Sequence, residues 1–386
     1  MKEKFLRELA DIQTGPFGSQ LHKEDYVADG TPIVTVEHLG NKMFSEQNLP
    51  RVSNTDKNRL KKYVLKQGDI VFSRVGSVDR CSYVDQKHDG WMFSGRCLRV
   101  RPTSEIDSEY LYYYFCLEET KQFVRNIAVG ATMPSINTKL LGEVVVTFPE
   151  LEQQKRISGI LSAIDSKIEV NQKINDNLEQ QAAALFSSLY NRSNTEVRYT
   201  DLIQILGGGT PKTGETAYWN GNIAFFTPKD VGTPYTFITE KTITEEGLSH
   251  CNSRLYPVNT VFVTARGTVG KVGLSGVPMA MNQSCYALVG KETHQLLVYF
   301  YTLKVVDKLK HKASGAVFDA ITTRDFESEQ IMKLSDDDAR AFLCVAEPMF
   351  QEILNNSIEN LRLSTLRDFL LPKLMSGEID VSNIQF

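Results

Sequence analysis

Residues 157–189 read ISGILSAIDSKIEVNQKINDNLEQQAAALFSSL, and apolar side chains recur along this stretch in steps of four and three. Such a seam is typical of a coiled-coil helix, and a helix of about 40 residues would be roughly 60 Å long. One helix cannot bury a stripe of that length by itself. The sequence therefore predicts a second long helix that packs against the first.

The chain supplies the second helix because it repeats itself. A shift of 185 residues aligns residues 111–189 with 296–374 without a gap, and 14 of the 79 positions are identical. Average residue usage would give about 5 identities by chance. The second seam is FLCVAEPMFQEILNNSIENLRLSTLRDFLLPKL, residues 342–374, and Pro348 and Pro372 are expected to kink it. We predict that the two helices pair as an antiparallel coiled coil with an internal pseudo-two-fold repeat.

Two asparagines fall at equivalent seam positions in each copy, namely Asn171 and Asn175 in the first and Asn356 and Asn360 in the second. Polar residues in a coiled-coil seam lower stability but fix register and orientation. The alternative is that all four are solvated surface side chains. We predict that they set the register between the two helices.

The remaining sequence divides into two mixed α/β globules, so the fold class is α/β (α+β). The expected ranges are 1–148 for the first globule, 149–192 for its helix, 193–335 for the second globule, and 336–386 for the second helix and tail. The composition, 41% hydrophobic and 23% charged, is that of a soluble globular protein. No run of 18 apolar residues and no CxxC pair occurs, so we expect a cytoplasmic protein with reduced thiols, no membrane contact and no metal site.

Each globule opens with a glycine-rich loop, GPFGS at 15–19 and GGGTPK at 207–212, and neither has the spacing of a nucleotide-binding loop. Farther on, each carries an apolar strand that ends in an arginine before a glycine, GDIVFSRVG at 68–76 and NTVFVTARG at 259–267. An arginine in that place suits contact with a phosphate or a guanine edge. It suits a structural ion pair equally well.

Basic and acidic residues are nearly balanced in the globules, so only local basic surfaces could bind a nucleic acid. Residues 1–150 carry 20 basic and 20 acidic side chains, and the net charge of −4 comes from residues 336–386, with 4 basic and 9 acidic. The loops and local basic clusters give the DNA-contact candidates Gly18, Ser19, Gln20, His38, Lys57, Arg59, Arg74, Ser77, Arg96 and Arg99 in the first globule, and Thr210, Lys212, Lys229, Arg266, Thr268, Lys271, Asn282 and Gln283 in the second.

Catalytic motifs do not occur in the sequence. It contains no [ND]PP[FYW] run for amino-methyl transfer, no nuclease motif, no Walker A motif and no HExxH, and its six histidines stand apart from any nucleophile. We therefore predict no catalytic residue in this chain.

Two longer motifs carry a family resemblance. FPELEQQKRI at 148–157 and LSTLRDFLLPKLMSGEI at 363–379, together with the opening loops, resemble the specificity subunit of type I restriction-modification systems over essentially the whole chain. The resemblance implies two target recognition domains, each reading one half of an asymmetric bipartite site in double-stranded DNA. The helices would set the gap between the halves.

The resemblance also implies partners and cofactors. The helices would dock two methyltransferase subunits, and two restriction subunits would join in the full complex. This chain would be a non-catalytic subunit without a cofactor of its own. S-adenosylmethionine would bind to the methyltransferase partner, and ATP and Mg²⁺ to the restriction partner. The second helix begins with LSDDD at 334–338, unlike the first copy, so we expect the two partner subunits to be held unequally.

Two other functions are compatible with the pattern. A stand-alone bipartite DNA-binding regulator would bind tightly without partners. A coiled-coil adaptor that does not bind DNA would not need an arginine before the glycine turn in both globules. We expect the specificity subunit.

Overall fold

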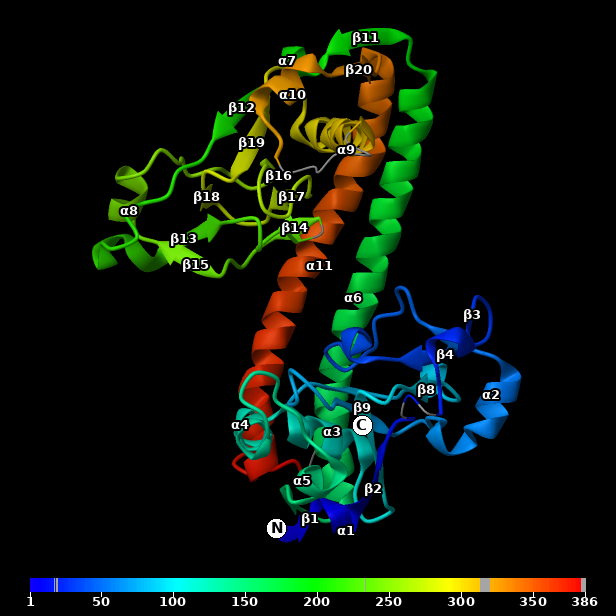
Figure 1. Cartoon of the computed structure of the whole chain (residues 1–386). Coiled ribbons are helices and arrows are strands. Elements are labelled where there is room, and N and C mark those ends of the chain that lie inside the picture. Colours follow the sequence, from blue (N-terminus) through cyan, green and yellow to red (C-terminus); the bar gives the residue numbers. More distant parts are fainter. Residues whose placement is uncertain (17, 19, 233, 313–319, 383–386) are drawn as a thin grey trace. The chain divides into compact units, whose positions relative to one another are not determined.

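The computed structural model describes residues 1–16, 18, 20–232, 234–312 and 320–382 (Figure 1). The chain forms two compact units. Unit 1 comprises residues 1–168 and 362–386, and unit 2 comprises residues 169–361. Each unit therefore contains one globule, a part of the first long helix and a part of the second.

The long helices are α6 (Leu151–Arg192) and α11 (Asp336–Ser376), close to the two helical ranges predicted from the seams. The start of α6 is tied to its globule by the buried Gln154 side chain, which donates to Pro149 O at 2.9 Å and accepts from the backbone N–H of Asp107 at 2.8 Å. At the other end, Gly377 has φ +79° and closes α11. Both sequence motifs thus mark helix boundaries.

Within each unit, polar side chains of α6 and α11 contact one another. In unit 2, Asn171 donates to Asn360 at 2.9 Å, and Asn356 donates to Asn175 at 3.0 Å. In unit 1, Arg367 pairs with Asp165 at 2.8 Å. The two contacts of unit 2 show that its helical segments are antiparallel. α11 remains helical through Pro348 and Pro372. The role of the asparagines in setting register stays a prediction.

The globule of unit 1 is built on an antiparallel sheet in the order β2-β9-β6-β7, and α3 packs against β7 and β9. A smaller sheet in the order β3-β5-β4-β8 holds the parallel pair β4 and β8. The bounds are β2 (Ala10–Thr14), β3 (Tyr26–Val27), β4 (Thr31–Val34), β5 (Arg51–Val52), β6 (Ile70–Ser73), β7 (Cys81–Tyr83), β8 (Met92–Phe93), β9 (Cys97–Pro102), α2 (Asn54–Arg59), α3 (Ser108–Cys116), α4 (Glu118–Ile127) and α5 (Thr138–Gly142).

Unit 2 repeats this order as β12-β19-β16-β17, with β14 added at the edge in parallel with β17. The parallel pair β13 and β18 corresponds to β4 and β8. A single helix, α9, covers β16, β17 and β19 where unit 1 has α3 and α4 (Figure 1). The bounds are β12 (Ile203–Gly207), β13 (Trp219–Phe226), β14 (Tyr235–Thr236), β15 (Lys241–Ile243), β16 (Val261–Thr264), β17 (Val272–Ser275), β18 (Met279–Met281), β19 (Cys285–Gly290), α8 (Glu245–Ser249), α9 (Gln295–Lys312) and α10 (Thr323–Ser328).

A strand pair closes each globule at its ends. β1 (Lys2–Phe5) pairs antiparallel with β10 (Val145–Phe148), and β11 (Thr195–Arg198) pairs with β20 (Gln330–Lys333). The short helices α1 (Leu6–Leu9) and α7 (Tyr199–Leu202) follow β1 and β11. The duplication predicted for both the globules and the helices is therefore present in the strand order of the described residues, except that β3 of unit 1 and β14 of unit 2 have no counterpart there.

Within the described ranges, no helix is long and apolar enough to cross a membrane, and no three metal-ligating side chains of the His, Cys, Asp and Glu types gather. The thiols of Cys97 and Cys285 begin equivalent strands, and burial raises the pKa of each to about 12. Both thiols therefore stay protonated at neutral pH and act as small apolar side chains.

Candidate nucleic-acid interface

The loops that carry most DNA-contact candidates in unit 1 are bonded to one another at the strand ends. The backbone N–H of Ser94 donates to Val34 O at 2.9 Å, and that of Arg74 donates to Arg96 O at 2.8 Å. The backbone N–H of Gly15 donates to Cys97 O at 3.2 Å. Four loops from distant parts of the sequence, after β2, β4, β6 and β8, therefore form one surface. We call it the loop cluster of unit 1.

Unit 2 has a loop cluster with the same internal bonds. The backbone N–H of Asn282 donates to Phe226 O at 3.0 Å, and that of Ala265 donates to Ser284 O at 2.8 Å. These bonds make Asn282 equivalent to Ser94, Ala265 to Arg74, and Ser284 to Arg96. A repeated scaffold therefore carries different side chains in the two units.

Gly15 and Gly208, in the opening loops of the two units, cannot be replaced for the same steric reason. A Cβ on Gly15 would lie 2.1 Å from Ser94 O, and a Cβ on Gly208 would lie 2.2 Å from Asn282 O. Any side chain at either position would push the β8–β9 or β18–β19 loop away. Close backbone packing thus explains Gly15 and Gly208.

His38 closes the turn after β4 as a structural side chain. It is buried, and its Nδ1 accepts from the backbone N–H of Thr35 at 3.1 Å and lies 2.8 Å from the Thr35 hydroxyl. Asp230 makes the same two contacts with Thr227 in unit 2. The accepting Nδ1 places the ring proton on Nε2, which faces Gln47 O at 3.2 Å. The structure therefore withholds His38 from a surface contact with DNA.

The two arginines before the glycine turns are not equivalent, which corrects the pairing that the sequence suggested. Ile136 donates its backbone N–H to Arg74 O, whereas the equivalent Ile321 donates to Ala265 O, one residue before Arg266. Arg74 is half-buried, and its guanidinium donates to Gly95 O at 3.1 Å, while Arg266 is exposed. Strand residues alternate in direction, so a shift of one residue changes which side an arginine occupies.

A cavity of about 700 Å³ lies in the loop cluster of unit 1. Among its lining residues, Arg80, Arg96 and Glu37 are exposed and charged, and Tyr26 is 38% exposed. Arginine suits the acceptors of guanine, and glutamate suits the amino group of cytosine. This cavity has the chemistry of a site that reads base edges.

The loop cluster of unit 2 exposes the predicted residues Lys229, Arg266, Thr268, Lys271 and Gln283. The Thr210 hydroxyl, from the opening loop, donates to Gln283 Oε1 and joins two candidates that are 73 residues apart in sequence. Lys229 also faces Glu240 at 3.5 Å, an exposed pair of small energetic weight. Lys212 is exposed in the opening loop, and Asn282 is half-buried.

Several other candidates of unit 1 are held by the fold. Arg99 is buried, with its guanidinium paired to Asp11 and donating to Lys62 O, so the structure withholds it from the surface. Arg59 pairs with Asp56 at 2.8 Å and donates to Gln20 O. Lys57 lies on the same short helix, α2. The side chain of Gln20 is also engaged, because its Oε1 accepts from the Tyr63 hydroxyl at 2.6 Å. The remaining candidates of unit 1 are Gly18 and Ser77, which are exposed in the loop cluster, and Ser19, which lies outside the described residues.

Sequence reasoning missed Arg80, Glu37 and Tyr26. Arg80 ends the same turn as Gly76, four residues farther on, so the turn itself gave a signal for it. The sequence contains no comparable signal for Glu37 and Tyr26, because neither is basic and neither belongs to a glycine turn. Their position depends on the small sheet β3-β5-β4-β8, which brings Tyr26 of β3 and Glu37 of the turn after β4 to the same cavity.

Comparison with known proteins decides the family. The model of the type I restriction modification DNA specificity domain matches residues 1–180 and 191–333, one match for each copy of the repeat. The chain belongs to this family. The chain is 25% identical to the HindI specificity subunit of Haemophilus influenzae, over 82% of this chain and 88% of that one. It is 24% identical to the MjaIX specificity subunit of Methanocaldococcus jannaschii, over 74% and 72% of the two chains.

The family resemblance extends to the fold. The crystal structure of the S subunit from M. genitalium superposes with a TM-score of 0.59 at 16% identity, over 97% of this chain and 95% of that one. Type I specificity subunits are the non-catalytic DNA-recognition component of their restriction-modification complexes. The chain is therefore a DNA-recognition subunit, as the sequence motifs predicted.

Proposed function

We propose that each unit reads one half of a bipartite, asymmetric DNA site through its loop cluster. The observation that carries this proposal is the repeated set of backbone bonds, which holds different side chains at equivalent places. Arg96 of unit 1 corresponds to Ser284 of unit 2, and Glu37 corresponds to Lys229, because Val34 and Phe226 accept equivalent bonds. Two equal scaffolds with unequal side chains would recognise unequal sequences.

The long helices would set the gap between the half-sites and dock two methyltransferase subunits, and two restriction subunits would join in the full complex. Exposed apolar side chains on both helices support a protein partner there. Val170 and Ile174 on α6 are 49% and 41% exposed, and Val345 and Phe369 on α11 are 44% and 59% exposed. Val170 and Ile174 lie one helical turn apart and form an exposed apolar pair, which suits contact with a protein partner.

Cofactors would belong to the partners in this proposal. S-adenosylmethionine would bind to the methyltransferase subunit, and ATP and Mg²⁺ to the restriction subunit. This chain would contribute base recognition and geometry. Each part of the reaction would then depend on assembly, because recognition and methyl transfer reside in different subunits.

Co-expression with its methyltransferase subunit, followed by sequencing of methylated adenines in the host genome, tests the proposal. We expect methylation at one split sequence, with two specified parts and a gap of fixed length, and none when either subunit is absent. A continuous methylated sequence, or failure of the two proteins to form a complex, would contradict the proposal. Tight, specific DNA binding by the isolated chain would instead favour a stand-alone bipartite regulator.

A further inference from the structure

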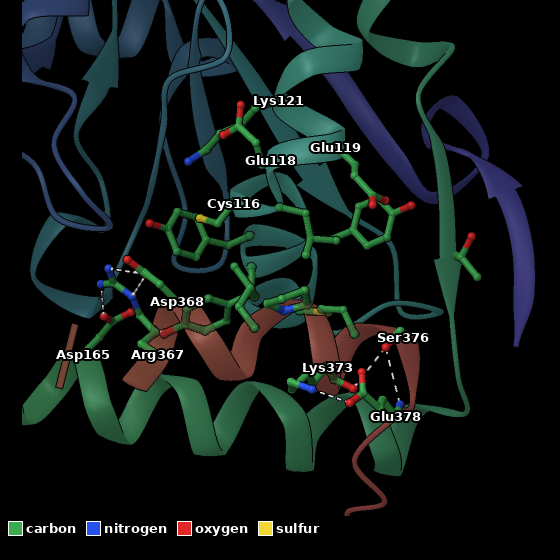
Figure 2. A pocket seen from close by; sticks show the side chains of 18 of the residues that line it. Cys116, Glu118, Glu119, Lys121, Asp165, Arg367, Asp368, Lys373, Ser376 and Glu378 are labelled. Carbon is green, nitrogen blue, oxygen red and sulfur yellow. Dashed lines mark hydrogen bonds and ion pairs between the residues drawn. The ribbon is translucent and has the colours of Figure 1, made fainter. Parts of the chain in front are cut away.

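Unit 1 contains a second, larger cavity of about 1050 Å³, away from its loop cluster (Figure 2). One wall comes from α3, α4 and the residue between them, residues 112–121, and the other comes from α11, residues 367–376. Cys116 of α3 faces the α11 wall, and Asp165 of α6 lies at one end beside Arg367 (Figure 2). No part of the DNA-reading surface borders this cavity.

The same place in unit 2 is filled by aromatic rings. The 185-residue offset makes Cys116 equivalent to Tyr301, and Leu371 equivalent to Phe186. In unit 2, Phe186 is fully buried, with its ring centroid 5.3 Å from that of Tyr301 and 5.1 Å from that of Phe300. Unit 1 thus has a thiol and a leucine where unit 2 has two rings in contact.

Three more positions show the same replacement, and two of them, Met375 and Asp165, line the cavity. Met375, Ile157 and Asp165 of unit 1 are equivalent to Tyr190, Phe342 and Phe350 of unit 2. In unit 2, Phe342 lies 5.5 Å from Phe186, and Tyr190 lies 5.7 Å from it, between ring centroids. Five aromatic side chains that pack this place in unit 2 are therefore absent from unit 1, where the cavity lies. Two rings of unit 1 replace aliphatic residues in turn, because Tyr112 and Tyr113 of the cavity wall are equivalent to Leu297 and Val298.

The rim of the cavity shows what kind of group would enter it. Phe369 is 59% exposed and lies one helical turn before Pro372 and Lys373, which line the cavity. The equivalent residue of unit 2 is Ala184. Most of the lining charges are already paired, Arg367 with Asp165 and Asp368, Lys373 with Glu378, and Glu118 with Arg125. Glu119 is exposed at the rim and is the carboxylate that would meet a basic group. An entering group with an aromatic ring beside a basic side chain would match both features.

We propose that this cavity receives an aromatic side chain, flanked by a basic one, from the methyltransferase subunit that docks on unit 1. The inference rests on the proposed function, which supplies the partner. In unit 2 the chain's own Phe186 occupies the corresponding place. The two methyltransferase subunits are therefore held by different contacts, and only the one on unit 1 inserts a ring.

The test fills the cavity with the residues of the other copy. The double variant Cys116→Tyr and Leu371→Phe is titrated with the methyltransferase subunit, and complexes are counted by native mass spectrometry. We expect the parent chain to bind two methyltransferases and the variant to bind one tightly, with the second weakened by at least about tenfold. Two methyltransferases bound with unchanged affinity would overturn the inference. If the parent chain binds none, the proposed function itself fails.

Thermal unfolding shows whether the double variant folds. If it does not fold, single variants at the surface provide a second test. Phe369→Ser and Glu119→Lys change exposed side chains at the rim, and each is expected to weaken one of the two binding steps. Ala184→Ser is the matched control, because it changes the exposed position equivalent to Phe369 in unit 2. Equal binding by Phe369→Ser, Glu119→Lys and Ala184→Ser would contradict the inference.

Discussion

Gly15 and Gly18 lie three residues apart in one loop but differ in what surrounds them. A Cβ at Gly15 would meet Ser94 O at 2.1 Å, whereas a Cβ at Gly18 would meet no atom within 4 Å. We predict that Gly15→Ala displaces the β8–β9 loop, lowers the free energy of unfolding by about 1–3 kcal/mol, and impairs recognition of the first half-site. Gly18→Ala is expected to leave stability unchanged. Denaturant unfolding of the two variants measures the difference, and equal losses would show that the close approach is not what requires the glycine.

Arg80 and Arg96 are the two arginines of the unit 1 cavity that we expect to read bases. Either one replaced by alanine is predicted to relax one position of the first half-site, since a good bidentate contact contributes about 1–3 kcal/mol of discrimination. The second half-site is expected to remain unchanged. Lys61→Ala, an exposed change outside the cavity lining, is the control. Binding of the assembled methyltransferase complex to a panel of single-base variants measures this, and uniform weakening over all sequences would indicate phosphate contact instead.

Glu179 gives a pH-dependent contribution to the stability of unit 2. Burial raises the pKa of its carboxyl above the ordinary value, and the hydroxyl of Tyr299, which donates to Oε1 at 3.0 Å, offsets part of that rise. A raised pKa means that the folded state holds the proton more tightly than the unfolded state. The contribution of Glu179 to stability therefore falls as pH rises from the ordinary pKa of glutamate through the raised one.

Glu179→Gln removes this titration and keeps an oxygen that accepts from Tyr299. We predict a higher melting temperature than that of the parent chain at pH 7. The difference should shrink as pH falls and vanish below the ordinary pKa of glutamate, where both side chains are neutral. Melting curves across that pH range measure it. A difference that is constant with pH would mean that ionisation of Glu179 is not its cause.

Single residues were the hardest part of the interface to predict. His38 and Arg99 had the right chemistry and sequence neighbourhood, but Thr35 and Asp11 hold them inside the fold. A sequence shows which side chains can bind DNA and does not show which of them an internal partner already occupies. Arg80, by contrast, belongs to a turn that the sequence marked clearly.

The long helices are the elements that the sequence predicted best, because a seam of more than 30 residues is a local pattern. β1 and β10 could not be predicted in the same way, since about 140 residues separate two strands of four residues each. The parallel pair of β4 and β8 is a similar case, with only two paired positions. Pairings of this kind depend on the tertiary fold and leave little periodicity in the sequence.

Asn175 and Asn356 give the helix pair of unit 2 a contact that can be tested. The Asn356 amide donates to Asn175 Oδ1 at 3.0 Å, and both side chains are buried. Asn175→Leu alone leaves the Asn356 amide group without that acceptor, so we predict a loss of about 1–3 kcal/mol in the free energy of unfolding. The double replacement with leucine is expected to be less harmful than either single one, because a polar pair is replaced by an apolar one. Denaturant unfolding of all four chains measures the coupling, and additive losses would contradict it.

At the scale of the whole molecule, the chain contains the same unit twice with different details. The sheet order, the closing strand pairs and the bonds of the loop clusters agree between the copies. The charged side chains of the loop clusters and the packing of α11 and α6 against their globules differ. The features that agree form the common scaffold. We interpret the features that differ as the source of two unequal half-sites and two unequal partner contacts.

The most direct test of two independent readers is an exchange of one globule. Residues 1–148 are replaced by the corresponding globule of another type I specificity subunit, and methylated adenines are sequenced in cells that also carry the methyltransferase. We predict that one half of the methylated sequence changes, while the other half and the gap stay the same. A change in both halves, or methylation of the original sequence, would contradict the account.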